Sequence, residues 1–515
     1  MIFASPYPPV DVPGIPLTWY VLRHARRYGS RVAIIDVAGE RQYTYAELES
    51  AVRRVSGALR VRGFRKGDVL ALLAPNLPEY PIAYHAAALA GGTVVALNPL
   101  DTADDLARHL NEAGARLVVT VPSEVAKTAA LIGRTKVEEI IVFGDADGAT
   151  PFSSLASFSG DAPPEPAVDP ARDVVTILHS SGSTGYPKGV LLTHRNLAAS
   201  ALQTSLIAPS AADEKVLAVP PFHHAFGLSM VMNAGLLQGS TIVTMPRFEP
   251  EAFLKAIQDH RITRLYAVPT MVVMLAKSPL VDRYDLSSVR LIVSGGAALD
   301  PAISRLCEQR LGCRVGQGYG LTEGLPSFMQ HDDAAPGSVG RNAPGIECKI
   351  VDIATGGELG PNRDGEILYR GPHVMKGYLS APEVTAKTLE PDGFLHTGDL
   401  GHVDDNGELF IVDRIKELIK YKGQQVSPVE LEALLVSHPK VADAAVIGVP
   451  DEDASELPKA FVVAKEPATP EEIMAYVAER VAPYKKIRRV EFIDQIPRTP
   501  VGKIERRSLK QREYS

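Results

Sequence analysis

Apolar residues in the first four-fifths of the chain fall into short runs separated by segments with helical periodicity. The short, mainly apolar runs predict buried strands at 69–73, 93–97, 117–121, 174–178, 216–219, 241–245, 264–268 and 291–294. The clearest helix is predicted at 45–62, where one face carries Leu48, Val52, Val55 and Leu59. Thr44 and Glu47 have the spacing of a capping box at its start, and Gly63 ends it. Strands that alternate with helices predict an α/β fold with mostly parallel sheets flanked by helices.

The pattern changes after about residue 407. Strands are predicted at 409–412, 444–449, 460–464 and 490–493, and helices at 428–437 and 471–481. Thr469, Pro470 and Glu472 predict a capping box with proline at the first helical position. We therefore expect a large N-terminal domain over 1–413 that includes a small β subdomain, a hinge at 414–416, and a small α+β C-terminal domain over 417–515.

Composition is that of a globular protein with an uneven charge distribution. The chain has 515 residues, is 45% hydrophobic and 22% charged, and its 54 basic and 61 acidic residues give a net charge of −7. This balance argues against a dedicated nucleic-acid-binding protein. Residues 480–515 contain eleven basic and four acidic residues, a local balance of +7, so the remainder carries −14. The basic segment predicts either a nearby anionic ligand or a solvated charged surface.

Cysteine usage and the N-terminus indicate the compartment. Cys307, Cys313 and Cys348 have neither a disulfide framework nor Cys-x-x-Cys spacing, which predicts buried, reduced thiols. The N-terminal segment lacks a signal-peptide pattern, and no run of about 18 apolar residues occurs. We therefore expect a soluble, cytoplasmic protein without a stable membrane anchor.

The segment 180–189, Ser-Ser-Gly-Ser-Thr-Gly-Tyr-Pro-Lys-Gly, is the most informative motif and directly follows a predicted strand. Its glycines and hydroxyl residues supply backbone N–H and O–H donors, and Lys188 adds a positive charge, so the loop can wrap a polyphosphate. It is not a Walker loop, because Pro187 stands where the second glycine is required. A flexible surface turn is the alternative, but the position after a buried strand favours phosphate binding.

This loop resembles the signature of the acyl-adenylate-forming superfamily, which includes acyl-CoA synthetases, firefly-type luciferases and peptide-synthetase adenylation domains. Further motifs follow in order: 317–323 resembles its Tyr-Gly-x-Thr-Glu block, 397–399 its Thr-Gly-Asp, 413–416 its hinge and 499–503 its C-terminal lysine segment. The resemblance spans essentially the whole chain, and 416–425 is most similar to 4-coumarate–CoA ligases. It implies a ligase that uses ATP, Mg²⁺ and CoA, forms an acyl-AMP and then an acyl-CoA thioester, and has a mobile C-terminal domain.

The resemblance also implies the nucleotide-binding residues. The loop residues expected to hold the phosphates are Ser180, Ser181, Gly182, Ser183, Thr184, Gly185 and Lys188. Tyr319 is expected to stack on adenine, Thr322 to contact the α-phosphate and Glu323 to coordinate Mg²⁺. Asp399 is expected to accept hydrogen bonds from the ribose, with Arg414 nearby. The remaining expected nucleotide-binding residues are Gly296, Ala297, Gln317, Gly318 and Gly320.

Catalytic residues follow from the same resemblance. Lys503 is expected to bridge the reacting carboxylate and the α-phosphate, and Lys416 to serve as the hinge. Lys420 and Gln425 match residues that 4-coumarate–CoA ligases use for catalysis. His224 fits a His-x-x-Gly pattern that its neighbour His223 does not, and the family places this histidine between the acid pocket and the pantetheine tunnel. Lys422 and Gly423 are expected to border the CoA path.

The acid is predicted less sharply than the reaction. The expected acid-pocket residues are Phe226, Gly296, Gly318, Pro326 and Ser327, and the overall resemblance favours an aryl or cinnamate-like acid. Residues 323–328 read Glu-Gly-Leu-Pro-Ser-Phe, whereas plant members usually read Ala-Gly-Pro-Val after the glutamate. No aspartate occurs between residues 215 and 241, which argues against an α-amino acid. A medium-chain fatty acid, transfer to a separate carrier protein, a luciferase-like oxygenase and a nucleotide sensor are the alternatives.

Overall fold

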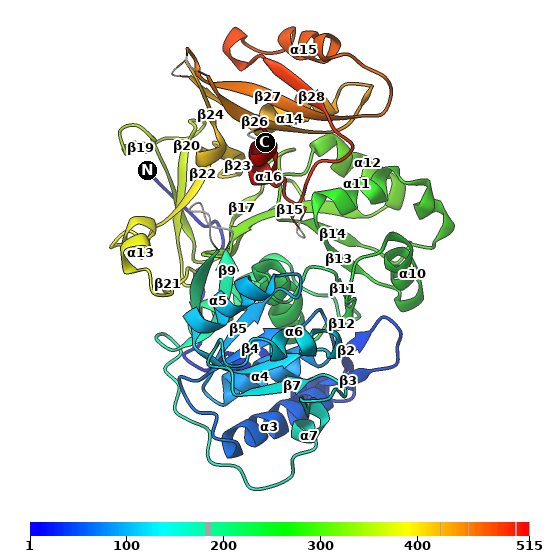
Figure 1. Ribbon diagram of the computed structural model, residues 1–515, viewed down its shortest axis with the longest axis vertical. Coiled ribbons are helices and arrows are strands. Elements are labelled where there is room, and N and C mark those ends of the chain that lie inside the picture. Colours follow the sequence, from blue (N-terminus) through cyan, green and yellow to red (C-terminus); the bar gives the residue numbers. More distant parts are fainter. Residues whose placement is uncertain (181–186, 423, 452, 500–501, 514–515) are drawn as a thin grey trace.

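The computed structural model describes residues 1–180, 187–422, 424–451, 453–499 and 502–513. Three sheets with their helices make up the chain as far as Arg414, and a fourth sheet with its own helices forms a smaller C-terminal unit (Figure 1). The three sheets and their helices are called the large unit below, and the rest of the chain the small unit. The predicted α/β class, with a small α+β unit at the C-terminus, is confirmed.

The first large sheet has eight strands with a parallel centre. In spatial order the strands are β21 (Gly377–Tyr378), β10 (Lys188–Thr193), β9 (Val174–Ser180), β5 (Thr93–Leu97), β4 (Val69–Leu73), β6 (Ala115–Thr120), β7 (Glu139–Val142) and β8 (Thr150–Pro151). The strands from β9 to β8 are parallel, whereas β10 returns antiparallel to β9 and pairs with β21. The loop 181–186 therefore joins two neighbouring antiparallel strands.

The second large sheet has nine strands and is parallel from β15 to β2. Its spatial order is β17 (Arg341–Asn342), β16 (Leu325–Met329), β15 (Arg314–Leu321), β14 (Leu291–Ser294), β13 (Arg264–Ala267), β11 (Lys215–Ala218), β12 (Thr241–Thr244), β2 (Val32–Asp36) and β3 (Gln42–Thr44). Both large sheets confirm the strands that short apolar runs predict.

Helices cover these sheets. The longer ones are α3 (Tyr45–Val61), α4 (Tyr80–Leu89), α5 (Ala103–Ala113), α8 (His194–Ile207), α10 (Pro250–His260), α11 (Pro269–Lys277) and α12 (Pro301–Leu311). The short ones are α1 (Leu17–Val21), α2 (Ala25–Tyr28), α6 (Val125–Ala129), α7 (Phe152–Ala156), α9 (Ala234–Gln238) and α13 (Pro382–Thr388), and a π-helix spans Gly227–Asn233. Within the described ranges, no helix has the length and apolarity needed to cross a bilayer.

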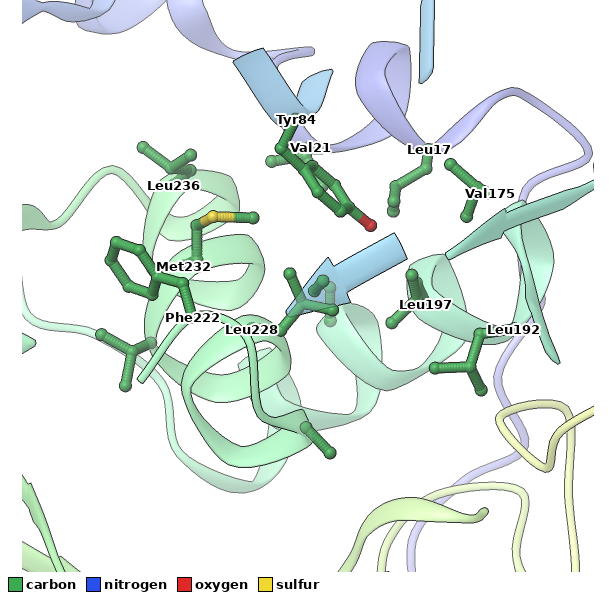
Figure 2. Close-up of a cluster of buried hydrophobic side chains, with 14 of the residues drawn as sticks. Leu17, Val21, Tyr84, Val175, Leu192, Leu197, Phe222, Leu228, Met232 and Leu236 are labelled. Atoms are coloured by element: carbon green, nitrogen blue, oxygen red, sulfur yellow. The ribbon is translucent and has the colours of Figure 1, made fainter. Parts of the chain in front are cut away.

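A buried apolar cluster joins the two large sheets. Figure 2 shows side chains from α1, α4, β9, β10, α8 and the π-helix meeting in it, with Tyr84, Leu197, Phe222, Leu228 and Met232 among them. Each of these five side chains is fully buried. The segment that carries His223 and His224 runs directly from Phe222 into the π-helix, so this core fixes where both histidines lie.

The remaining part of the large unit is an antiparallel sheet in the order β1 (Ile2–Ala4), β18 (Glu347–Val351), β20 (Gly365–Arg370), β22 (Leu395–Val403) and β23 (Leu409–Arg414), with β19 (Glu358–Leu359) beside β18. The chain leaves β23 through a 3-10 turn at Ile415–Glu417. It then enters the small unit, whose strands are β24 (Ile419–Tyr421), β25 (Gln424–Val426), β26 (Val441–Asp451), β27 (Ser455–Ala464) and β28 (Arg489–Phe492), and whose helices are α14 (Pro428–Val436), α15 (Pro470–Ala478) and α16 (Arg506–Glu513).

The N-termini of α3 and α15 are the two places where the sequence predicts a capping box. At α3, the Thr44 hydroxyl accepts from the Glu47 N–H, and Glu47 accepts from the Thr44 N–H at 2.8 Å, so the predicted capping box is present. At α15, Thr469 caps the N–H of Glu472, but the Glu472 carboxylate pairs with Lys440 at 2.9 Å. The predicted Thr469 cap and the proline at the first helical position are present at α15, and the Glu472 carboxylate also interacts with the Thr469 N–H beside its ion pair with Lys440.

The basic C-terminal segment is largely neutralised inside the small unit. Its ion pairs include Lys485–Glu430, Arg489–Glu513, Arg498–Asp443, Arg506–Glu417, Arg506–Glu432 and Arg512–Glu491. Much of the +7 therefore stabilises the small unit internally. Lys503 differs, because it lines a cavity between the small unit and the large unit.

Replacing Glu214 by leucine is expected to destabilise the large unit. Glu214 pairs with Arg264 at 3.0 Å, and the two side chains are 4% and 5% exposed, so the change leaves a buried cation without its partner. Losing one member of such a pair costs about 3–5 kcal/mol of unfolding free energy. Urea unfolding followed by circular dichroism measures the effect.

The neighbouring acid provides the control. Asp213 pairs with Arg290 on the surface, where its side chain is 70% exposed, so Asp213→Leu should change the free energy of unfolding far less than Glu214→Leu does. Equal shifts for the two variants would contradict the buried-pair account.

Candidate active site

A cavity of about 840 Å³ opens where the two large sheets, the antiparallel sheet and the small unit meet. It lies at the carboxyl ends of parallel strands: residues 179–180 end β9, and residues 293–294 end β14. Open α/β sheets bind ligands in the crevice outside the carboxyl ends of their strands. The topology therefore makes this cavity the candidate active site.

One wall of the cavity carries a tyrosine, a carboxylate and an arginine in contact. The Tyr319 hydroxyl donates to Oδ2 of Asp399 at 2.5 Å, and Arg414 Nε lies 2.6 Å from Oδ1. Asp399 and Arg414 are directly opposite each other on β22 and β23, so the strand register creates the ion pair. Burial raises the pKa of Asp399, and the guanidinium of Arg414 opposes that rise.

Glu323 forms the carboxylate end of the same cavity. It follows β15 in the turn to β16, with Thr322 beside it, and its Oε1 accepts from the Tyr378 hydroxyl at 2.9 Å. No group of three or more metal-binding side chains occurs among the described residues. A single carboxylate beside a hydroxyl suits Mg²⁺, which keeps water and substrate phosphate oxygens as its other ligands. Glu323 and Thr322 therefore fit that ion better than they fit a transition metal.

Lys503 reaches the cavity from the small unit. A tight turn holds it: the Thr499 N–H donates to the Lys503 carbonyl, and the Gly502 N–H donates to the Thr499 carbonyl, both at 2.8 Å. Gly502 has φ +79°, and a Cβ there would lie 3.4 Å from the Val268 side chain of the large unit. Burial lowers the pKa of Lys503, and nearby Arg414 lowers it further.

Two adjacent histidines line the cavity before the π-helix. Gly227 is required there, because a Cβ would lie 2.2 Å from the Pro221 carbonyl oxygen. His224 Nδ1 accepts from the Phe226 N–H at 3.4 Å, which leaves Nε2 to carry the ring proton. Burial lowers the pKa of His224 to about 3 and that of His223 to about 4, so both rings are neutral at pH 7.

Most of the described residues that the sequence predicts for the site are brought together. Those lining the cavity are Ser180, Lys188, His224, Phe226, Gly296, Gly318, Tyr319, Gly320, Thr322, Glu323, Pro326, Arg414, Lys416 and Lys503. Asp399 joins them through its contacts with Tyr319 and Arg414.

Three predicted residues of the large unit lie elsewhere. The Ser327 hydroxyl is buried and donates to the Gly324 carbonyl at 2.9 Å, outside the cavity lining, so its place in the acid pocket stays a prediction. The Gln317 side-chain amide accepts from the Leu299 N–H at 2.6 Å and donates to the Ser338 carbonyl at 3.2 Å. It therefore links two backbone segments outside the cavity lining. Ala297 is exposed and outside the cavity lining.

Two other residues that are predicted to act from the small unit, Lys420 and Lys422, are not in the cavity lining. Lys420 is exposed on β24, where its N–H donates to Glu456 at 2.7 Å, and the Lys422 N–H donates to the Ala454 carbonyl at 2.9 Å. Gln425 lies opposite Lys420 in the strand register; its side chain is not described. The predicted residues that fall outside the described ranges are Ser181, Gly182, Ser183, Thr184, Gly185 and Gly423.

Sequence reasoning missed a histidine pair in the cavity wall. His109 of α5 stacks on His179 with 3.7 Å between ring centroids, and both line the cavity with Asp101. Burial lowers the pKa of His109 to about 4 and that of His179 to about 3. The one sequence feature that could have pointed to this pair is that His179 directly precedes the Gly/Ser-rich loop. Met230 of the π-helix, also in the lining, had no such feature.

Comparisons with known proteins agree with this geometry. The family model described as AMP-binding enzyme matches residues 21–379, and the model for the AMP-binding enzyme C-terminal domain matches 430–503. The chain is 41% identical to 4-coumarate–CoA ligase 5 of Oryza sativa subsp. japonica, over 99% of this chain and 97% of that one. It is 39% identical to 4-coumarate–CoA ligase 2 of Nicotiana tabacum, over 99% and 97%.

Solved structures show the same likeness. ATP-bound MatB from Rhodopseudomonas palustris superposes with a TM-score of 0.88 at 30% identity, covering 97% of this chain and 99% of that one. The anthranilate CoA ligase AuaEII in complex with anthranoyl-AMP gives a TM-score of 0.89 at 25% identity, with 98% of each chain covered.

Replacing His224 or His396 by glutamine is expected to change acid stability in opposite directions. Unfolded His224 takes up a proton below about pH 6.5 but the folded ring does not until about pH 3, so its stabilising contribution is lost as pH falls through that range. His396, also in the cavity wall, hydrogen-bonds to Glu366, which raises its pKa. Its contribution is complete below the unfolded pKa and is lost as pH rises through the folded pKa.

Thermal unfolding midpoints measured between about pH 5 and about pH 9 test these two opposite pH dependences of stability. The difference between the original protein and His224→Gln should shrink as pH falls, while the difference for His396→Gln should grow. The same slope for both variants would contradict the assigned protonation states.

Proposed function

Because the chain belongs to the AMP-binding enzyme family, we propose that it is an ATP-dependent carboxylic acid–CoA ligase that works through an acyl-AMP intermediate. The observation that carries the proposal is the meeting of Lys503 from the small unit with Glu323, Tyr319 and His224 of the large unit in one cavity. A nucleotide-binding module alone has no need of a cation delivered from a second unit to that position. ATP, the acid and CoA are the small-molecule substrates.

The first half-reaction places the acid carboxylate against the α-phosphate. A carboxylate oxygen attacks phosphorus, the bond to the bridging oxygen breaks, and pyrophosphate leaves with that electron pair. Two anions must approach each other, so neutralising and positioning charge are the main tasks of the site. The Lys503 ammonium lies between them, Thr322 contacts the α-phosphate, and Tyr319 stacks on the adenine. Glu323 would hold Mg²⁺, which would supply further charge neutralisation to the phosphates.

Nucleotide recognition rests on groups that are already oriented. Arg414 holds one oxygen of Asp399, and the other accepts the Tyr319 hydroxyl. Asp399 is thereby fixed as the acceptor for the ribose hydroxyls. Lys188 and the Gly/Ser-rich loop are assigned to the β- and γ-phosphates, with Ser180 at the start of the loop.

The second half-reaction transfers the acyl group to CoA. The thiol sulfur attacks the acyl carbonyl, the bond to AMP breaks, and AMP leaves as the anion. Lys503 has no further task here, so we assign 414–416 as the hinge about which 417–515 rotates, with Lys416 at its centre. Rotation withdraws Lys503 and presents the face that carries Lys420, Lys422, Gly423 and Gln425. The neutral His224 lies where the acid pocket meets the thiol path.

The acid is proposed to be an aryl or cinnamate-like carboxylate. Phe226 and Tyr266 meet edge to face with 5.8 Å between ring centroids, and a Cβ on Gly295 would lie 3.1 Å from the Phe226 ring. Met230 and Pro326 add apolar surface to the cavity lining. Apolar and aromatic lining of this kind suits an aromatic ring. The relatives named as 4-coumarate–CoA ligases support the same class, and we propose a cytoplasmic location.

A panel of carboxylic acids, assayed for pyrophosphate release with and without CoA, is expected to show the strongest stimulation by aryl and arylpropenoic acids. Stimulation confined to medium-chain fatty acids would assign the alternative substrate. Acyl-AMP that accumulates with CoA present would favour transfer to a carrier protein, and release that no acid stimulates would contradict ligase function altogether.

Lys503→Ala is expected to slow acyl-AMP formation by about 100-fold or more, because one preorganised charge at the reacting group is lost. The same variant should pass supplied acyl-AMP to CoA at nearly the original rate. Stopped-flow or quench-flow assays of each half-reaction measure the two rates separately.

Lys510→Ala is the matched control, since Lys510 is an exposed lysine on α16 of the same small unit. It should leave both half-reactions unchanged. An equal loss of both half-reactions in Lys503→Ala would contradict the division of labour between the two faces.

A further inference from the structure

Tyr378 contacts both Lys188 and the Glu323 carboxylate. Its strand, β21, pairs antiparallel with β10, the strand that follows the loop, and Tyr378 lies opposite Val190. The Lys376 N–H donates to the Leu191 carbonyl at 2.9 Å, and the Leu379 N–H to the Gly189 carbonyl at 2.7 Å. Backbone bonds on both sides of Tyr378 therefore fix it to the end of the loop.

The segment 375–378 also forms two hydrogen bonds with Glu323. The Met375 N–H donates to the Glu323 carbonyl at 2.8 Å, and the Tyr378 hydroxyl donates to Glu323 Oε1 at 2.9 Å. The hydroxyl is the donor in this contact, because a carboxylate oxygen accepts. One carboxylate oxygen is thus engaged, and Oε2 is left for another partner.

The ring of Tyr378 has a second contact on its face. Lys188 Nζ lies 5.2 Å from the ring centroid, within the range of a cation–π interaction. Tyr378 also lines the cavity together with Lys188 and Glu323. The Tyr378 side chain therefore contacts both Lys188 and the Glu323 carboxylate.

We propose that Tyr378 is a positioning residue that aims Glu323 at the divalent cation of the bound nucleotide and couples it to Lys188. The proposal rests on the proposed function, because it requires a nucleotide–metal complex in this cavity. A glutamate in a turn has several side-chain rotamers, and a hydrogen bond to one oxygen selects the rotamer that presents the other. A single side chain thereby sets the orientation of the Glu323 carboxylate and contacts Lys188.

Tyr378→Phe isolates the hydroxyl, because the ring and its contact with Lys188 remain. Mn²⁺ serves as the probe, and its binding to the full-length protein with a non-hydrolysable ATP analogue is followed by electron paramagnetic resonance. The dissociation constant for Mn²⁺ should rise by about 10-fold, as expected for a lost hydrogen bond to a charged group. Tyr378→Leu, which also removes the ring, should weaken binding of the analogue itself as well.

Tyr45→Phe is the matched control. Tyr45 is buried far from the cavity lining, and its hydroxyl donates to the Ser240 carbonyl at 2.7 Å, so this change removes a hydrogen bond of similar length. It should lower thermal stability and leave Mn²⁺ binding unchanged.

The outcomes separate this proposal from the function on which it rests. If the original protein does not bind Mn²⁺ with the ATP analogue, the proposed function fails. If the original protein binds it and Tyr378→Phe binds it equally well, the positioning role is overturned. A loss of Mn²⁺ affinity that Tyr45→Phe reproduces would also overturn it, because that result indicates a general effect of stability.

Discussion

The cavity depends on a charge balance between two units of the chain. Arg414 and Lys503 bring positive charge into a largely buried space, and Asp399 and Glu323 bring negative charge. Buried charges are costly unless each has a partner. Lys503 is the only one of these four groups supplied by the small unit, and burial together with Arg414 lowers its pKa. Under the proposed function, substrate anions in the cavity would stabilise Lys503 there, and their departure would remove that stabilisation. Chemistry and the position of the small unit are therefore linked by the same electrostatics.

The scaffold explains how residues distant in sequence meet with the required accuracy. Parallel strands of both large sheets end at the cavity, so Ser180 at the end of β9 in one sheet and Tyr319 within β15 in the other face one space. The antiparallel sheet adds Asp399 opposite Arg414 by strand register. Residues 374–379 then tie the loop strand to Glu323 through backbone bonds. Because most of these positions are set by strands, the site is largely formed before substrate binds.

Local patterns predicted elements better than they predicted side-chain directions. The run 69–73 and the capping box at Thr44 suffice for β4 and α3, because burial and helix capping act over a few residues. The order of the family motifs assigned Tyr319 and Lys503 to one predicted site, and both residues line the cavity. The orientation of Ser327 depends on the Gly324 carbonyl and a buried histidine from a distant segment, contacts that the local sequence does not reveal. The stack of His109 on His179 joins α5 to β9 and has no local signature, so only the tertiary structure reveals it.

The central claim is that one orientation of the small unit places Lys503 in the cavity and another withdraws it. Spin labels on cysteines introduced at Lys277 of α11 and Lys510 of α16, both exposed, report the distance between the units by double electron–electron resonance. The three native cysteines are buried and free. With a non-reactive acyl-AMP analogue the account predicts one narrow distance distribution, and with CoA added a second, separate distribution. A distribution that CoA leaves unchanged would contradict the account.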